Sequence, residues 1–242
     1  MNPPGSSART INPILYLHDG RPSQQRRSLV AESVHGVHIA GRPKTEELSV
    51  TEPAHRTGGQ DAVARLSALL RPHRGPSVVT MGTFDGVHDG HAALLAHAKG
   101  LATARGLRTI AVTFSPRPDQ VLSPEHSLPD IVPIAERVDR LHASGVDDVV
   151  VIPFDRALAT VTAERFARLL ATDLSMRTLC VGEDFALGHN REGSVAYLRG
   201  LGVDVVACPL IRTAGRARKI SSSVIRRAIA DGVAPDQAWQ AA

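Results

Sequence analysis

Five short runs of apolar residues recur along the chain from Ser77 onward, and each is followed by a stretch with helical periodicity. The runs cover residues 78–83, 107–114, 148–152, 178–181 and 203–207, and helices are predicted at 89–104, 134–144, 162–172, 192–200 and 221–230. Near-continuous Val and Ile runs are typical of parallel strands that helices cover on both faces. The pattern therefore predicts an α/β fold with a doubly wound, mostly parallel five-stranded sheet that binds ligands at the carboxyl ends of its strands.

The first 76 residues have a different pattern. Prolines and glycines are scattered through them without a sustained period, apart from residues 61–70, where the pattern predicts a short amphipathic helix. Segments of this composition cannot bury enough apolar surface to offset the entropy of ordering. We therefore expect residues 1–76 to be a low-complexity, disordered extension, and residues 77–242 to form the folded domain.

Charge and composition narrow the function classes. Residues 1–76 hold ten Lys and Arg against six Asp and Glu, whereas the remainder holds eighteen of each, so the net charge of +4 lies in the extension. The folded part therefore gives no indication of nucleic-acid binding. There is no apolar run of membrane-spanning length and no signal peptide pattern, and Cys180 and Cys208 lack metal-ligand spacing. We expect a cytoplasmic protein with two buried thiols and no membrane partner.

The stretch from Gly82 to His91 predicts a phosphate site. It leads from a strand through a polar turn into a helix, whose first turn offers free N–H groups and the positive end of the helix dipole. His88 and His91, three residues apart, would face the same way. The chain has neither a P-loop nor a GxGxxG run. The two histidines could instead be a helix cap and a surface residue, without a ligand. A zinc site is disfavoured, because His97 lies too far round the helix to be a third ligand.

A second helix start near the C-terminus has a similar design. Ser221, Ser222 and Ser223 open a helix, and Arg226 follows one turn later. Hydroxyls, N–H groups and a guanidinium that converge on one point are suited to phosphate oxygens. Alone, this pattern is more typical of an ordinary serine N-cap with an exposed arginine, but two such helix starts in one parallel sheet favour a shared phosphate ligand.

Four ordered motifs resemble a known family. Gly82–His91 and Ile220–Arg226 resemble the HxGH nucleotidylyltransferases, whose fold is Rossmann-like. Val181–Gly193 is similar to the VGxDFxFGxxRxG segment of bacterial FAD synthases, and Thr113–Pro118 is similar to their TFxPxP loop. The resemblance extends over residues 78–239 and implies an FMN adenylyltransferase module, which transfers AMP from ATP to FMN and produces FAD and pyrophosphate. ATP and FMN are the implied partners, and Mg²⁺ bound with ATP is the implied cofactor.

The resemblance also implies roles for individual residues. The expected catalytic residues are His88, His91, Ser222 and Arg226. The expected nucleotide-binding residues are Gly82, Thr83, Phe84, Asp85, Gly90, Ser221 and Ser223. The expected acceptor-binding residues are Ser115, Pro116, Arg117, Asp184, Phe185 and Arg191. None is expected to be a protein ligand of a metal, and Asp85 could equally order the turn.

Some positions depart from the family pattern. Ser115 and Arg117 stand where the family has an acid and a histidine or similar group, and Ala186 and Leu187 replace larger residues. The riboflavin kinase domain that usually follows is expected to be absent. Two alternatives remain open at this point: a cytidylyltransferase or adenylyltransferase with another small phosphorylated acceptor, and a non-catalytic regulator that binds a flavin or nucleotide.

Overall fold

The computed structural model describes residues 58–73, 75–209, 221–234 and 237–239. The expected disorder of residues 1–57 lies outside the described residues, as does Ile220 of the last motif.

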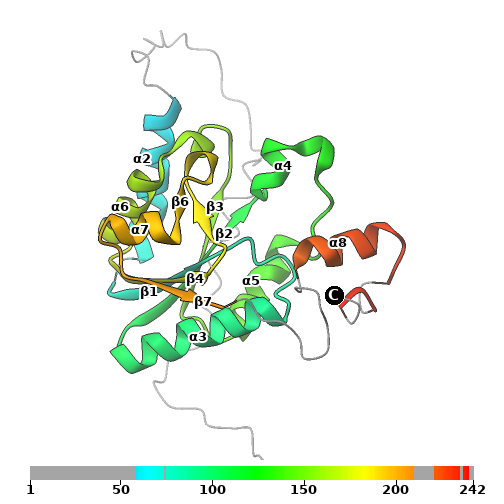
Figure 1. Cartoon of the computed structure of the whole chain (residues 1–242), viewed down its shortest axis with the longest axis horizontal. Coiled ribbons are helices and arrows are strands. Elements are labelled where there is room, and N and C mark those ends of the chain that lie inside the picture. The colour runs from blue at the N-terminus through cyan, green and yellow to red at the C-terminus, as the bar shows by residue number, and fades with distance from the viewer. Residues whose placement is uncertain (1–57, 74, 210–220, 235–236, 240–242) are drawn as a thin grey trace, which may run out of the picture. The chain divides into compact units, whose positions relative to one another are not determined.

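A five-stranded parallel sheet forms the centre of the fold (Figure 1). Its strands are β1 (Ser77–Met81), β2 (Arg108–Ser115), β3 (Asp148–Pro153), β4 (Met176–Gly182) and β7 (Val205–Cys208), and their order is β3-β2-β1-β4-β7. The chain builds outward from β1 to β3 and then returns to the other side of β1. The connections on the two sides of β1 therefore lie on opposite faces of the sheet, which confirms the predicted doubly wound arrangement.

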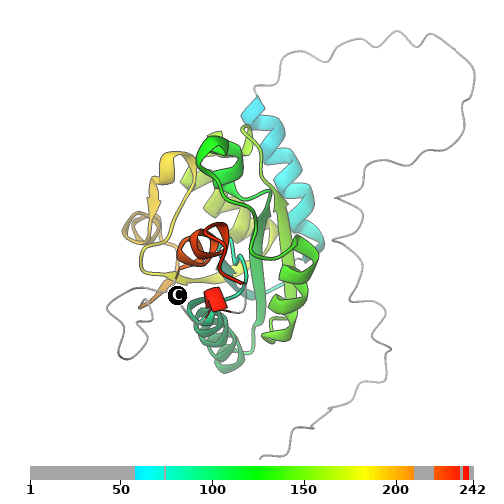
Figure 2. The same ribbon diagram turned by 90° about the vertical axis from the view of Figure 1, so that its right-hand side faces the viewer.

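Helices cover both faces of this sheet. The helices α3 (Asp89–Arg105) and α5 (Ile134–Ala143) lie on one face, and α2 (Gly58–Leu70), α6 (Ala163–Asp173) and α7 (Val195–Gly200) lie on the other (Figure 1). Two more helices, α4 (Pro118–Leu122) and α8 (Ser222–Ala230), lie at the carboxyl ends of the strands and face the viewer in Figure 2.

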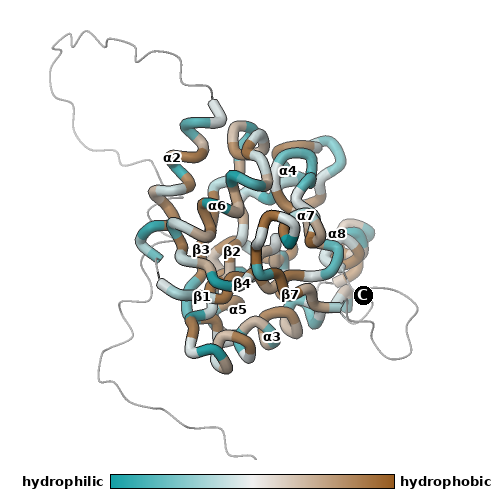
Figure 3. Tube along the Cα trace, turned by 60° about the vertical axis from the view of Figure 1, so that its left-hand side comes forward, coloured by the Kyte–Doolittle hydropathy of each residue, from teal (hydrophilic) through white to brown (hydrophobic). Residues whose placement is uncertain are grey.

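Alternate residues of each strand enter different cores. Val79 and Met81 of β1 pack with α2, α6 and α7, whereas Val78 packs with Ala98 and Ala102 of α3. All five residues of β1 are buried. Burial on both faces explains why the strands read as continuous hydrophobic runs, and Figure 3 shows the strands as mainly hydrophobic.

Helix α2 moves the start of the packed fold upstream of the expected boundary at Ser77. Ala62, Leu66 and Leu70 are buried and belong to the same core as β1 and α6. They recur every four residues, so they form one narrow stripe on the helix. The sequence pattern correctly predicted a helix here but did not show that the sheet needs it as a cover. The packed fold includes Gly58 onward.

Short elements depart most from the predicted ones. The helix expected at residues 192–200 begins only at Val195, and a small hairpin precedes it. A Cβ at Gly188 would lie 2.4 Å from the backbone N of Ala163, and one at Gly193 would lie 2.6 Å from the Cβ of Ala163. Because Gly188 and Gly193 have no Cβ, the hairpin can pack closely against Ala163 at the start of α6. The short elements are η2 (Arg71–His73), η3 (Pro124–His126), η4 (Leu158–Thr160), β5 (Ala186–Leu187), η5 (His189–Arg191) and β6 (Gly193–Ser194).

Among the described residues, none of the helices combines the length and the apolar character that crossing a bilayer requires.

Candidate active site

The turn between β1 and α3 is held in an unusual backbone conformation. Phe84, Gly86 and Val87 all have positive φ angles, of 46°, 82° and 55°. The side chain of Phe84 is fully buried, and its ring meets the ring of His91 edge-on at 5.2 Å. Positive φ is costly for residues with a Cβ, so packing has to enforce it. The buried Phe84 ring anchors the turn in this way and aims the start of α3 at the cavity.

His88 and His91 lie together at the N-terminus of α3. Their rings stack with centroids 3.8 Å apart and planes 19° apart, and His88 is the N-cap residue. Nδ1 of His91 is buried and has no hydrogen-bond partner among the described residues. Burial, together with the nearby His88, Arg137 and Arg226, lowers the pKa of His91 to about 3. At neutral pH the His91 imidazole is therefore uncharged and donates through one N–H.

Gly90 leaves the space that His88 occupies. A Cβ at Gly90 would lie 3.1 Å from Cε1 and 3.2 Å from Nδ1 of His88, which is tighter than ordinary packing. We expect Gly90→Ala to displace the His88 ring by a few tenths of an ångström and to lower the rate of catalysis by on the order of tenfold. The folded state should be no less stable, because alanine favours the helix. Steady-state kinetics and thermal unfolding measure the two effects.

Gly100 provides the matched control for this variant. It lies on the same helix, and nothing is within 4 Å of the Cβ that it would carry. Gly100→Ala should therefore gain about 0.5–1 kcal/mol of stability and leave the rate unchanged. Full activity in Gly90→Ala would contradict the need for a fixed His88 ring.

The start of α8 faces the same cavity. Ser221 is the N-cap in an extended conformation, without a side-chain cap hydrogen bond. Ser222 is buried and donates from Oγ to the carbonyl oxygen of Asp85 at 3.0 Å. Arg226 donates to Oδ2 of Asp85 at 2.8 Å and to Oγ of Ser223 at 3.2 Å. The turn after β1 thus holds α8 in place, so that two helix N-termini open onto one cavity.

Asp85 lies below the cavity and orders the turn. Its carboxylate is fully buried and accepts from the backbone N of Ile131 at 3.0 Å. Besides Arg226, it has Arg117 at 3.4 Å and Arg137 at 3.6 Å. Asp85 does not line the cavity. Of the two roles open in the sequence, the structure supports turn ordering.

Arg117 is another buried residue that does not line the cavity. Its guanidinium is fully buried, forms ion pairs with Asp119 and Asp130, and donates to the carbonyl oxygen of Leu128. Arg137, which is equally buried, pairs with Asp130 at 2.9 Å and donates to the carbonyl oxygens of Thr83 and Phe114. We refer to Asp85, Asp119, Asp130, Arg117, Arg137 and Arg226 as the carboxylate–arginine network. The expected acceptor role of Arg117 has no support in this placement, since the network uses its donors.

The other expected acceptor residues divide into two groups. Asp184, Phe185 and Arg191 line the cavity at the carboxyl end of β4, where Arg191 donates to the carbonyl oxygen of Asp184 at 3.2 Å. Ser115 and Pro116 do not line it, although their neighbours Phe114 and Pro118 do. The loop after β2 therefore meets the cavity through apolar side chains at its two ends.

The cavity itself has a volume of about 760 Å³, within the range of about 300–1,000 Å³ that is usual for small-molecule sites. It lies at the carboxyl ends of β1 and β4, where the strand order reverses. Its described lining includes three histidines and two arginines against a single carboxylate, that of Asp184. Such a lining suits an anionic ligand.

Several lining residues were not expected from the sequence. They are Met81, Ala93, Leu94, His97, Phe114, Pro118, Gly182, Ala186, Cys208 and Pro209. His97 lies two turns into α3, and Cys208 ends β7, so only the pairing of distant elements brings them together. His97, Cys180 and Cys208 form a cluster apart from the His88–His91 pair.

Known proteins resemble this chain over the same region. The bifunctional riboflavin kinase/FMN adenylyltransferase of Escherichia coli strain K12 is 34% identical over 159 residues, which are 64% of this chain and 50% of that protein. The protein of the same description from Bacillus subtilis strain 168 is 27% identical over 166 residues, 68% and 52% of the two chains. The chain thus spans about half the length of the curated relatives it matches.

One solved structure shares the fold over a similar extent. A crystal structure described as a macrolide-efflux protein from Streptococcus pneumoniae superposes with a TM-score of 0.59 at 30% identity, over 65% of this chain and 53% of that one. The sequence model of the FAD synthetase family matches residues 70–224, from the end of α2 to the first turn of α8. Both the α3 and the α8 helix starts lie within that match, and the chain belongs to the FAD synthetase family.

Proposed function

We propose that this chain is an FMN adenylyltransferase, which transfers the AMP group of ATP to FMN and releases pyrophosphate. The observation that carries the proposal is the convergence of two helix N-termini, those of α3 and α8, on one cavity of suitable size. The names of the matched relatives and the membership in the FAD synthetase family support the choice of substrates.

The reaction is a displacement at the α-phosphorus of ATP. An oxygen of the FMN phosphate forms the new bond, the bond from the α-phosphorus to the oxygen bridging to the β-phosphorus breaks, and the electron pair leaves with pyrophosphate. FMN's phosphate is already ionised at neutral pH, so no side chain has to act as the nucleophile. The protein contributes mainly positioning and stabilisation of the developing charge.

The described residues divide this work. His88 and His91 donate hydrogen bonds to oxygens of the α-phosphate, where their stacked rings present N–H groups side by side. Ser221, Ser223 and Arg226, with the first N–H groups of α8, hold the β- and γ-phosphates and the leaving pyrophosphate. Ser222 and the carboxylate–arginine network keep this helix start fixed relative to the histidines.

The acceptor binds on the β4 side in this proposal. Phe185 and Phe114 offer apolar surface for a flavin ring, and Arg191 offers a cation for its phosphate. The guanidinium of Arg191 donates to the carbonyl oxygen of Asp184 at 3.2 Å, which directs it toward the carboxyl end of β4.

The cavity fits Mg²⁺ that arrives with ATP. Mg²⁺ retains waters and prefers oxygen ligands, most of which the phosphates themselves supply. The described lining offers the carboxylate of Asp184 and the hydroxyls of Ser221 and Ser223 as further oxygens, which suits a cation with few protein ligands. Bound there, Mg²⁺ would neutralise charge on the phosphate oxygens.

Incubation of the purified chain with FMN, ATP and Mg²⁺ tests the proposal, with FAD and pyrophosphate as the products to be measured. Riboflavin, which lacks the attacking phosphate, should give no product. CTP in place of ATP distinguishes a cytidylyltransferase, and flavin binding without turnover would indicate a regulator. Absence of FAD, with transfer to another phosphorylated acceptor, would refute the choice of FMN.

A further inference from the structure

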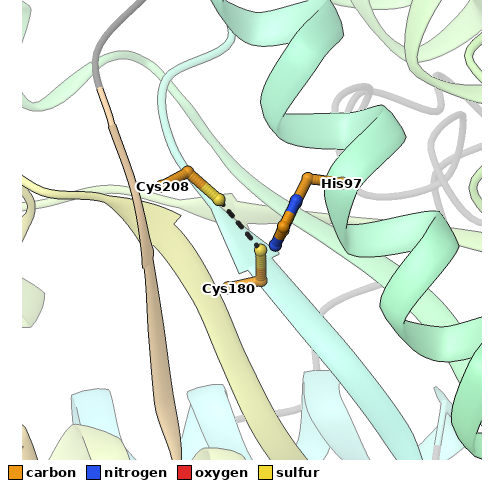
Figure 4. A group of neighbouring side chains, drawn as sticks. All are labelled: His97, Cys180 and Cys208. Carbon is orange, nitrogen blue, oxygen red and sulfur yellow. Dashed lines mark hydrogen bonds between the residues drawn. The ribbon is translucent and has the colours of Figure 1, made fainter.

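Three side chains that the transfer reaction does not use come together beside the cavity, and two of them, His97 and Cys208, line it. His97 projects from α3, Cys180 from β4 and Cys208 from the end of β7 (Figure 4). A ring nitrogen and the two sulfurs all lie within 4.8 Å of one another, and the two Sγ atoms are 3.6 Å apart. All three are typical metal ligands, and they come from separate elements of the sheet and its covering helix.

Their spacing is close to that of a tetrahedral zinc site. With Zn–S bonds of about 2.3 Å, two sulfurs at tetrahedral positions are roughly 3.7 Å apart. The observed Sγ–Sγ distance of 3.6 Å matches this edge. With Zn–N bonds of about 2.0 Å, a sulfur and a nitrogen at tetrahedral positions are roughly 3.5 Å apart, so separations within the observed limit of 4.8 Å need to shorten by at most about 1.3 Å. A small rotation of the exposed His97 side chain supplies such a change.

A disulfide fits this arrangement less well than a metal. In the β4–β7 pairing, Cys180 lies opposite Val206, whereas Cys208 lies opposite Gly182. The two cysteines are therefore offset by two residues along neighbouring parallel strands. That places their Cα atoms roughly 8 Å apart, beyond the about 4.4–6.8 Å that a disulfide spans.

We propose that His97, Cys180 and Cys208 bind a zinc ion, with the fourth coordination position open to the cavity. Two thiolates and an imidazole select zinc over the hard Mg²⁺ of the transfer reaction. The cation has a route to the site, because His97 is exposed and both His97 and Cys208 line the cavity. Cys180 is fully buried, so its sulfur lies on the side of the site that faces the protein interior.

Zinc binding replaces the protons of both thiols. Each sulfur exchanges its proton for a bond to zinc, and the imidazole contributes its lone pair. No oxidation or reduction takes place, and a weakly buffered solution should acidify by one proton per thiol.

Cobalt(II) provides a spectroscopic probe of this site in the reduced full-length chain. A tetrahedral Co²⁺–thiolate centre has an intense near-ultraviolet charge-transfer band that histidine or carboxylate ligands alone do not produce. The chain contains two cysteines, so this band can arise only from Cys180 and Cys208, although eleven histidines are present. We expect the band at one Co²⁺ per chain and its loss on addition of one equivalent of Zn²⁺.

Two variants and a matched control define the ligands. Cys208→Ser should weaken the band and the affinity for Zn²⁺, and His97→Ala should lower the affinity by on the order of a hundredfold while one thiolate pair still gives a band. Both positions are at least partly exposed, so the fold should tolerate the changes, which circular dichroism verifies. His126→Ala, at a histidine with 82% side-chain exposure, should bind like the unaltered chain.

Two outcomes would overturn the proposal. One is a Co²⁺ complex without a thiolate band, and the other is a disulfide-linked chain under conditions that should permit zinc binding. Neither measurement needs FMN or ATP, so a failure here is separate from a failure of the transferase assignment.

Discussion

Replacing Asp85 with alanine should lower the free energy of unfolding by about 3–5 kcal/mol, because it removes a fully buried carboxylate that three arginines share. Asp85 is fully buried and lies within 3.6 Å of Arg117, Arg137 and Arg226. Arg117 and Arg137 are themselves fully buried, so water cannot replace the lost partner. Chemical denaturation of the two proteins measures the difference.

Asp85→Asn removes the negative charge of the side chain and keeps its size and shape. Asparagine keeps an oxygen for the backbone N of Ile131 but loses the negative charge, so we expect a smaller yet clear loss of stability. In this variant Arg226 should also be less well fixed, which raises the KM for ATP. Asp139→Asn, at an exposed position of α5, is the control and should change stability by less than about 0.5 kcal/mol. An Asp85→Ala protein as stable as the control would contradict the structural role of the network.

Replacing His91 with alanine should lower kcat by on the order of a hundredfold or more, the usual cost of removing a donor to a developing oxyanion. His91 is held between the edge of the Phe84 ring and the stacked ring of His88, so its N–H has a fixed position beside that of His88. The KM for ATP should change less, because Arg226 and the serines of α8 still hold the triphosphate. Initial rates of FAD formation at saturating and limiting ATP measure both quantities.

His91→Asn tests whether the missing function is a hydrogen-bond donor. Its amide can donate, so it should recover part of the lost rate, whereas His126→Ala should have full activity.

A second readout is the pH dependence of stability, which follows from the pKa of His91, about 3 against a usual 6.5. Below pH 6.5 the His91 side chain becomes protonated in the unfolded chain but stays neutral in the folded chain. Lowering the pH therefore lowers the free energy of unfolding. His91→Ala should lose less stability than the unaltered chain between pH 7 and 5. An unchanged kcat would refute the role of His91.

The sequence pattern was sufficient for the sheet but not for its irregular parts. All five strands lie where Val- and Ile-rich runs predict them, because burial on both faces leaves a strong signal. The hairpin of β5 and β6 has two residues in each strand, too few for a period to be visible. Helix α2 was visible as a helix, but a single stripe of Ala62, Leu66 and Leu70 does not tell which surface it covers.

At the candidate site, the sequence motifs correctly indicated the residues at the two helix starts, but they did not indicate that Arg117 is buried. Helix starts are local features, so His88, His91, Ser221–Ser223 and Arg226 could be recognised from spacing, and the structure brings them to one cavity. Arg117 lies in a proline-rich loop and the sequence suggests an exposed ligand-binding residue, but its partners Asp85 and Asp130 lie elsewhere in the chain and bury it. The His97, Cys180 and Cys208 cluster was missed for the same reason, since 28 residues separate the two cysteines.

The hydrogen bonds from Ser222 and Arg226 to Asp85 span 137 and 141 residues of chain. Ribosomes synthesise the Asp85 end of each contact first, and the partner emerges only after the whole sheet has been made. A nascent chain that has reached β7 therefore holds the carboxylate of Asp85 without Arg226, and the turn after β1 without α8. The cavity that both elements line is complete only after α8 has been synthesised, so the site forms later than the sheet that carries it.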